Sequence, residues 1–228
     1  MGLPSDLSTS TARLVRDWTW VPIRALGPRH RERVAAHLMS LDERDRFLRF
    51  GYPATDAQIV KYVDTLDFDR DEVFGIFNRR LELIAMAHLA NAPAAQQPDQ
   101  RTMAEFGVSV LSKARGRGHG ARLFERAVLH ARNRGAETLF IHALSENTAM
   151  LKIARKAGAV VERDGSESEA WLKLPPETIA SQVGEIMEAQ AAEIDYQLKV
   201  QAHRVNEFLE TLSEVKTHIN GKAPIASE

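Results

Sequence analysis

The fold is decided by one stretch in the middle of the chain, which reads Val108-Ser109-Val110-Leu111-Ser112-Lys113-Ala114-Arg115-Gly116-Arg117-Gly118-His119-Gly120-Ala121. This pattern predicts a strand, a glycine-rich loop and the start of a helix. A helix start exposes backbone N–H groups without partners and carries the positive end of the helix dipole. The glycines have no Cβ, so the backbone can close around an anion. A diphosphate group is therefore the expected ligand of this loop.

Two other phosphate-binding loops fit this stretch less well. A dinucleotide-binding loop belongs at the start of a parallel sheet and is followed about twenty residues later by an acid. Here three predicted antiparallel strands precede the loop, and the nearest acid, Glu137, comes before the next strand instead of ending it. The P-loop lysine followed by Ser or Thr is also missing. A plain glycine-rich turn remains the structural alternative.

Working outward, hydrophobic spacing and turn residues predict a regular series of elements. Toward the N-terminus they predict a tail at residues 1–17, a strand at Trp18–Arg24, a helix from Pro28, a helix capped by Thr55 or Asp56, and strands at Val73–Asn78, Leu81–Ala90 and Glu105–Leu111. Residues 91–101 are predicted as a loop. Toward the C-terminus they predict a helix at Gly118–Arg134, a strand at Thr138–Leu144 buried on both faces, a helix at Asn147–Ala157, and a hairpin of Val160–Arg163 with Ala170–Leu174.

Pro175-Pro176 marks a boundary, and residues 175–228 are predicted as a long amphipathic helical extension. Large apolar residues recur there at spacings near three and four, and an unbroken helix over residues 177–219 would be about 65 Å long. The helix either folds back over the domain or forms an intermolecular coiled coil. The heptad phase slips between Met187 and Ala202. We expect self-association or partner binding through residues 177–219.

Composition excludes several classes of function. The 228 residues carry a net charge of −1, so bulk charge does not favour nucleic acid or an anionic membrane surface. The chain has no cysteine, which excludes disulfides, thiolate catalysis and cysteine-ligated zinc, and we expect no metal site. No apolar run is long enough to cross a bilayer. We expect a soluble, cytoplasmic protein.

Two motifs together resemble the GNAT superfamily of N-acetyltransferases. The loop matches its Arg/Gln-x-x-Gly-x-Gly/Ala signature as Arg115-x-x-Gly118-x-Gly120. Downstream, Glu146-Asn147 begins a helix that ends in Lys156-Ala157-Gly158, which is similar to the second CoA motif of the family. The resemblance covers residues 18–174. It implies an α/β (α+β) fold with a mixed, mostly antiparallel central sheet flanked by helices.

The resemblance also implies an activity and a set of contacts. The activity is transfer of an acetyl group from acetyl-CoA to a primary amine, on a protein lysine or a small molecule, by direct attack in a ternary complex. Backbone groups of Val108 and Val110 would contact the pantetheine arm. The loop Arg115, Gly116, Arg117, Gly118, His119, Gly120 and Ala121 would hold the pyrophosphate. Asn147 would contact the cofactor from the other side or cap its helix together with Ser145.

The acceptor ammonium must lose a proton before it can attack, so a general base is needed. Glu105 is the first candidate because its position resembles the base of protein-acetylating members, although it could be a solvated edge residue. His142 is the second candidate, and its ordinary pKa of about 6.5 suits neutral pH. His88 is the third, while His119 is expected on the loop surface. The N–H near Val110 would stabilise the oxyanion.

The sequence departs from the family pattern at two places. Ala154 stands where many relatives have a tyrosine that protonates the leaving thiolate, and Ala159 stands where an aromatic residue usually follows the glycine. The general acid is therefore unassigned, with Ser145 or water as candidates. This departure keeps a second hypothesis open, in which the chain is a catalytically weak or inactive acyl-CoA-binding module that engages a partner through its C-terminal helix.

The segment expected to shape the acceptor site contains Arg46-Phe47-Leu48-Arg49-Phe50. It is similar to a segment in the acetyltransferase domain of bacterial protein-lysine acetyltransferases, which makes Arg46, Arg49 and Phe50 candidate substrate-binding residues. Two arginines could also bind a carboxylate of the acceptor. The alternative is a helix end with the phenylalanines in the core and the arginines in solvent.

Overall fold

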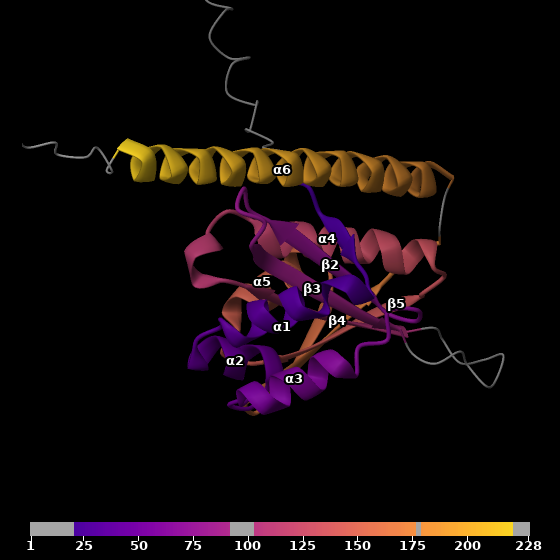
Figure 1. The fold of residues 1–228 in the computed structure, drawn as a ribbon. Coiled ribbons are helices and arrows are strands. Elements are labelled where there is room, and N and C mark those ends of the chain that lie inside the picture. The colour runs from indigo at the N-terminus through magenta and orange to yellow at the C-terminus, as the bar shows by residue number, and fades with distance from the viewer. Residues whose placement is uncertain (1–20, 92–102, 177–178, 221–228) are drawn as a thin grey trace, which may run out of the picture.

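The computed structural model describes residues 21–91, 103–176 and 179–220, with side chains in the last range at residues 182 and 184–204 (Figure 1). The predicted tail at residues 1–17 and nearly all of the predicted loop at residues 91–101 lie outside the described residues. No helix in the described part of the chain is both long enough and apolar enough to cross a membrane.

The described residues form one seven-stranded sheet in the order β1-β2-β3-β4-β5-β7-β6. Neighbouring strands are antiparallel except for the parallel pair β4 and β5, which confirms the mixed, mostly antiparallel sheet. The strands are β1 (Arg24–Leu26), β2 (Glu72–Phe77), β3 (Leu83–Asn91), β4 (Met103–Val110), β5 (Thr138–Leu144), β6 (Val160–Asp164) and β7 (Glu167–Lys173).

Helices cover both faces of this sheet (Figure 1). The first face carries the short 3-10 turn η1 (Pro28–His30) and the helices α1 (Arg31–Met39), α2 (Glu43–Phe50) and α3 (Asp56–Asp64). The second face carries α4 (His119–Asn133), which follows the turn η2 (Ser112–Ala114), and α5 (Thr148–Lys156). The long helix α6 (Ile179–Asn220) lies outside α4.

Local signals account for the helix starts on the first face. Thr55 accepts from the Gln58 amide, and the Gln58 side chain accepts from the Thr55 amide, so the predicted cap of α3 is confirmed as a capping box. Asp42 caps α2 by accepting from the Asp45 amide at 2.8 Å. Gly51 ends α2 in the left-handed region at φ 79°, where glycine carries no steric penalty.

Three strand predictions need correction. The first strand was expected at Trp18–Arg24, of which residues 18–20 lie outside the described residues; within residues 21–26 the strand is Arg24–Leu26, and Pro22 has no N–H to donate to a ladder. The second strand of the predicted hairpin begins at Leu83 because Leu81 takes a turn conformation with φ 58°. β5 is not buried on both faces, since His142 is exposed.

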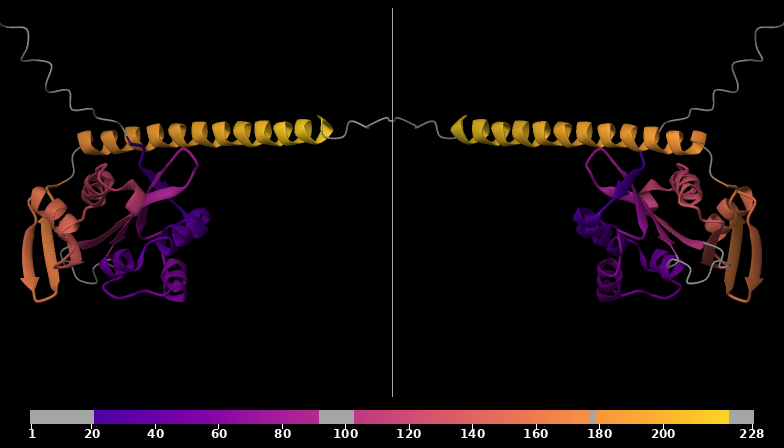
Figure 2. Two further views of the ribbon diagram at one scale, coloured as in Figure 1. Left: turned by 90° about the vertical axis from the view of Figure 1, so that its left-hand side faces the viewer. Right: turned by 90° about the vertical axis from the view of Figure 1, so that its right-hand side faces the viewer.

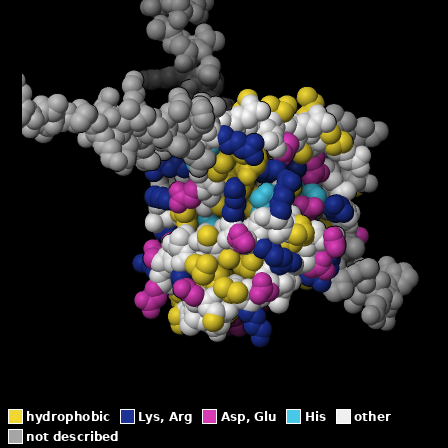
Figure 3. Space-filling model, in the orientation of Figure 1, with side chains coloured by type: hydrophobic (Ala, Val, Ile, Leu, Met, Phe, Trp, Pro, Cys, Tyr) yellow, Lys and Arg dark blue, Asp and Glu magenta, His cyan; other side chains and the backbone are white. Residues whose placement is uncertain are grey.

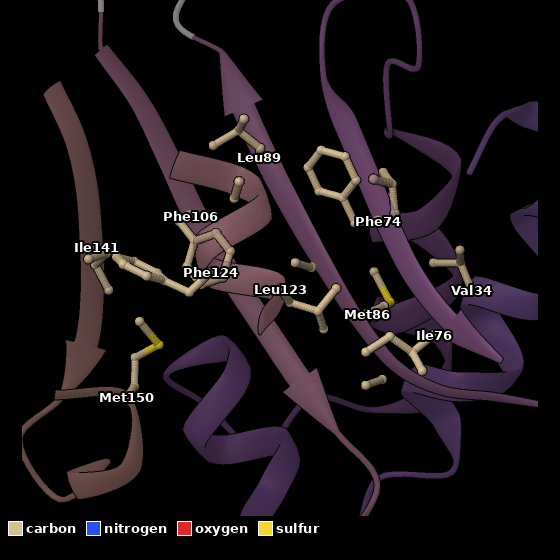
Figure 4. Close-up of a cluster of buried hydrophobic side chains, with 14 of the residues drawn as sticks. Val34, Phe74, Ile76, Met86, Leu89, Phe106, Leu123, Phe124, Ile141 and Met150 are labelled. Atoms are coloured by element: carbon tan, nitrogen blue, oxygen red, sulfur yellow. The ribbon is translucent and has the colours of Figure 1, made fainter. Parts of the chain in front are cut away.

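The core lies between the sheet and α4 on one side and between the sheet and α1–α3 on the other (Figure 4). Phe106 of β4 meets Phe124 of α4 edge to face, with ring centroids 5.1 Å apart. On the opposite face, the ring of His37 from α1 contacts the Ser109 hydroxyl at 2.8 Å. Alternate residues of β4 therefore face opposite helix layers, and Glu105, Gly107 and Ser109 share the face of α1–α3.

The first part of α6 packs on its own domain through polar contacts and through the ring of Tyr196, which meets Phe77 of β2. Glu185 accepts from His130 and Asn133 of α4, each at 2.6 Å, and Arg24 of β1 pairs with Glu193 at 2.7 Å. Burial alone would raise the pKa of Glu185, but the hydrogen bonds from His130 and Asn133 and the nearby charges lower it to about 2. Glu185 is thus a charged anchor that holds α6 against α4.

Candidate active site

The parallel strands β4 and β5 diverge, and a cavity lies where they part. Their register runs from Met103 with Thr138 to Glu105 with Phe140 and then ends. A cavity of about 870 Å³ follows the remaining half of β4 and continues to the start of α4 and to α5. Its wall includes Val108, Ser109, Val110, Gly118, Asn147 and Ile153.

The free edge of β4 presents backbone groups toward this opening. The Leu111 amide donates to the Ile84 carbonyl at 3.0 Å, so it points toward β3. Backbone groups of successive residues in a strand point to opposite edges, so those of Val108 and Val110 point toward β5. Because the ladder with β5 ends at Glu105, these groups are available to a ligand that extends the sheet.

The glycine loop ends in an open helix start, as the sequence predicted. Gly116 and Gly118 have φ of 76° and 78°, a region that costs other residues roughly 1–2 kcal/mol. Gly118 caps α4 without a side-chain hydrogen bond, and the first turn contains no acid. The first helical bond runs from Arg122 N–H to Gly118 C=O at 3.1 Å, which leaves the amides of the preceding residues in the first turn without helical partners. The loop lines the cavity, and an open helix start of this kind is suited to an anion.

The side chains of this loop lie where the sequence did not predict them. The Arg115 guanidinium pairs with Asp45 of α2, a carboxylate whose side chain is only 6% exposed. The hydrogen bond to Asp45 raises the pKa of Arg115. The side chain therefore ties the loop to α2, and the exposed Arg117 is left to face solvent.

His119 is buried, in contrast to the expectation that it lies on the loop surface. Its exposed fraction is 7%, and neither ring nitrogen has a hydrogen-bond partner among the described residues. Burial, together with the charges of Arg117 and Arg122, lowers the pKa of His119. The imidazole is therefore neutral at pH 7, and the loop's positive potential comes from its amides and arginines.

Neither candidate base lines the cavity. Glu105 is exposed at the last register pair of β4 and β5, three residues before Val108 of the cavity wall. His142 is also exposed, and its Nε2 lies 3.3 Å from Glu167 Oε2 on β7. Glu105 is thus close to the cavity wall along β4, whereas His142 is engaged with a carboxylate of β7.

Asn147 combines both roles that the sequence left open. Its Oδ1 accepts from the Met150 amide at 3.2 Å, which caps α5, and the residue also lines the cavity. Ser145 does not share the cap, because its hydroxyl donates to the Glu167 carbonyl at 2.8 Å. Ala154 of α5 is completely buried in the core. Because alanine has no hydroxyl, this position cannot donate a proton to the leaving group.

The two candidate substrate-binding arginines of α2, Arg46 and Arg49, have different environments, and neither is simply solvated. Arg46 donates to the backbone carbonyls of Met39, Leu41 and Ala54, so its guanidinium organises the chain around α2. Arg49 lines the cavity and donates to the Tyr62 hydroxyl at 2.9 Å. Phe50 is half-buried and packs edge to face on Tyr62.

Sequence reasoning missed Asp45 and Tyr62 as residues that hold side chains at the site. Asp45 pairs with Arg115 of the loop, and the Tyr62 hydroxyl accepts a hydrogen bond from Arg49. No local pattern marks them, because their partners come from distant segments.

The fold is an α/β fold in which a parallel strand pair diverges, a glycine loop leads to an open helix start, and a cavity lies between them. The chain belongs to the acetyltransferase (GNAT) family, since the sequence profile of that family matches residues 36–159, more than half of the 228 residues. The family resemblance read from the two motifs is confirmed. Members of this family use acetyl-CoA or another acyl-CoA.

Solved structures share the fold. They include the GNAT domain of S. lividans PAT (21% identity, TM-score 0.56, covering 67% of this chain and 89% of that one). The ribosomal-protein-alanine N-acetyltransferase of Brucella melitensis also matches (18% identity, TM-score 0.52, 67% and 99% covered). A GNAT-family acetyltransferase of Streptococcus pneumoniae is similar as well (14% identity, TM-score 0.52, 67% and 98% covered). At these identities the likeness concerns the fold alone. No curated protein sequence matches the chain.

Proposed function

We propose that the protein is an acetyl-CoA-dependent N-acyltransferase that acetylates a primary amine by direct attack in a ternary complex. One observation carries this proposal: the open start of α4, with glycines at positive φ, lines the cavity beside the free edge of β4. A pyrophosphate fits the loop amides, and an extended amide-containing arm fits the edge of β4. The pyrophosphate and the pantetheine arm of CoA could therefore both bind along one continuous wall of the cavity.

Each residue near the cavity then has a chemical task. The loop amides bind the pyrophosphate, the backbone of Val108 and Val110 orients the pantetheine arm, and Asn147 contacts it from α5. The acceptor nitrogen forms a bond to the thioester carbon, the carbon–sulfur bond breaks, and the thiolate departs. The proton of the acceptor ammonium goes to Glu105, directly or through one water. The Val110 N–H is our candidate donor to the oxyanion.

The second candidate is an acyl-CoA-binding module that lacks efficient turnover. The fully buried Ala154 favours it, since α5 offers no phenol to protonate the leaving thiolate. Thiol release separates the two functions. With acetyl-CoA and a panel of amino acids, polyamines and lysine peptides, we expect free CoA to accumulate with at least one class of amine. Tight calorimetric binding of CoA without release on any amine would instead establish the module.

We also propose that α6 mediates self-association with α6 of a second copy. Its contacts with the domain use Glu185, Ala192 and Glu193, whereas Met187, Ile194 and Leu198 on the opposite side of the helix are 61–66% exposed. Figure 3 shows hydrophobic side chains along the upper edge of the molecule, where α6 lies. Met187, Ile194 and Leu198 thus point away from the domain, whereas Tyr196 is the aromatic residue of α6 that packs on Phe77 of β2.

The sequence extends this apolar stripe, although Ala191 and Gln201 interrupt it. Beyond Leu198, large apolar residues recur every seven positions, at Val205, Leu212 and Ile219. Two helices with the same seven-residue apolar repeat can pack along their apolar stripes as a coiled coil. A second copy of the chain supplies such a helix. The C-terminal end of α6 extends past the domain, which leaves room for such a partner (Figure 2).

Charges placed on the stripe should dissociate this dimer. We expect the wild-type chain to sediment at twice its mass of 25.5 kDa and the double variant Ile194→Glu, Leu198→Glu to sediment as a monomer, because carboxylates would be buried unpaired. Ile186→Glu is the matched control, since this residue is 58% exposed but lies about 80–120° around the helix from those two. A wild-type monomer, or dissociation by the control alone, would contradict the proposal.

A further inference from the structure

A chain of polar side chains from four separate segments ends at the cavity wall. Asp71, just before β2, contacts His88 Nε2 of β3 at 3.2 Å. His88 Nδ1 contacts the Tyr62 hydroxyl of α3 at 2.8 Å, and Arg49 Nη2 of α2 donates to the same hydroxyl at 2.9 Å. Of these four residues, only Arg49 lines the cavity.

The chemistry of the groups sets the direction of these hydrogen bonds. Burial alone would raise the pKa of Asp71, but hydrogen bonds from Arg70 and His88 lower it, so its carboxylate accepts from His88 Nε2–H. Burial and the charge of Arg49 lower the pKa of His88, so the ring is neutral and its Nδ1 accepts the Tyr62 O–H. The Tyr62 oxygen is then free to accept from Arg49. The network therefore orients the guanidinium without neutralising it.

Arg49 is a half-buried cation with no acidic partner. Asp71 is paired with Arg70 at 2.8 Å, and no carboxylate of the described residues lies within salt-bridge distance of Arg49. The Arg49 Nε is buried without a hydrogen-bond partner. A buried charge without a counter-ion is costly unless a ligand supplies one. The site is thus prepared for an anion.

The guanidinium is held against β4 at Gly107. A Cβ at Gly107 would lie 2.9 Å from Arg49 Cζ, so only glycine allows this approach. Gly107 is two residues after Glu105 on the same face of β4, a separation of about 7 Å. Glu105, the candidate base for the acceptor ammonium, and the Arg49 guanidinium, which can bind a carboxylate, therefore lie side by side on the face of β4 that α1–α3 cover.

We propose that Arg49 binds a carboxylate of the acceptor, with Tyr62, His88 and Asp71 as the residues that position it. This inference rests on the proposed function and names its substrate class as amines that carry a carboxylate near the amino group, as amino acids do. Bidentate pairing of the guanidinium with that carboxylate would direct the amino group toward Glu105. Polyamines lack the anionic group and should be poor acceptors.

The test compares each L-amino acid with its primary amide as acceptor, using thiol release from acetyl-CoA. For each amino acid that is turned over, we expect the KM of the acid to be at least 10-fold below the KM of its amide. Chemical reactivity alone would favour the amide, because its amine has the lower pKa and loses its proton more readily. In Arg49→Gln the acid-to-amide preference should fall to about 1, and Arg49→Lys should retain part of it. Arg44→Gln, an exposed arginine of the same helix, should keep the full preference.

The positioning residues give a second readout. Tyr62→Phe and Gly107→Ala should each raise KM for the acid several-fold more than KM for the amide, since both would act on the acceptor through the placement of Arg49. Equal losses for acid and amide would mean a purely structural role and would overturn the inference. Preference for amides or polyamines by the wild-type protein would overturn it as well.

Failure of this inference is distinguishable from failure of the proposed function. Calorimetric titration of CoA measures binding at the loop, and CoA affinity that is retained in Arg49→Gln shows that the cofactor site of the variant is intact. If no amine is turned over, titration of N-acetyl amino acids and their amides into the CoA-saturated protein tests Arg49 directly. Binding of the acids that is lost in Arg49→Gln supports the inference, and equal binding of acids and amides refutes it.

Discussion

Gly118→Glu is expected to abolish CoA binding, with at least a 100-fold loss of affinity. The backbone at Gly118 has φ 78°, which a side-chain-bearing residue adopts at a cost of roughly 1–2 kcal/mol. The larger effect is electrostatic, because the new carboxylate would lie at the start of α4, where the pyrophosphate is proposed to bind. Isothermal titration of CoA into the variant measures the loss.

A control separates the electrostatic effect from backbone strain. Gly135, just after α4, has φ 80° and open space around its Cβ position, but it lies at the other end of the helix from the cavity. Gly135→Glu should lower thermal stability to a similar degree while it leaves CoA affinity within about twofold. Unchanged affinity in Gly118→Glu, or the same loss in both variants, would contradict an anion site at this helix start.

Glu105→Gln is expected to reduce kcat by roughly 100- to 10,000-fold, the range for loss of a general base. Glutamine keeps the shape of the side chain, and Glu105 forms no ion pair with the described residues, so we expect the fold to persist. CoA affinity should stay the same because the loop is untouched. Steady-state kinetics with a saturating amine measure the effect on kcat.

Two further variants make this result specific to Glu105. Glu169→Gln removes an exposed carboxylate from β7 and should leave kcat unchanged. His142→Gln should change kcat by less than about threefold, because the imidazole contacts Glu167 outside the cavity wall. A large loss in His142→Gln together with a normal rate in Glu105→Gln would reverse the assignment of the base.

Helix ends and the cofactor loop could be predicted because the signals that make them are local. The Thr55 cap depends on Gln58 three residues later, and the Asn147 cap depends on the Met150 amide at the same spacing. The open start of α4 follows from glycines within the loop itself. Hydrophobic patterns and turn residues predicted β2 to β5 to within two residues. The first strand was misplaced because its three residues are too short for any periodic pattern to identify.

The acceptor side of the site could not be predicted in the same way. Arg46 and Arg49 are three residues apart in one charged helix, yet one binds backbone carbonyls and the other faces the cavity. Which of them is available to a ligand depends on where β4 passes beneath α2. The pairing of Arg115 with Asp45 depends in the same way on two segments about seventy residues apart.

The sequence by itself determined the strand–loop–helix unit and the family, because backbone hydrogen bonds and glycine conformations at the start of α4 depend on near neighbours. Tertiary structure alone decided the chain from Asp71 through His88 and Tyr62 to Arg49, and the side of α6 that faces the domain. Long charged side chains have many partners of similar energy in the sequence. Only the packing of distant segments selects one partner and leaves another charge unpaired.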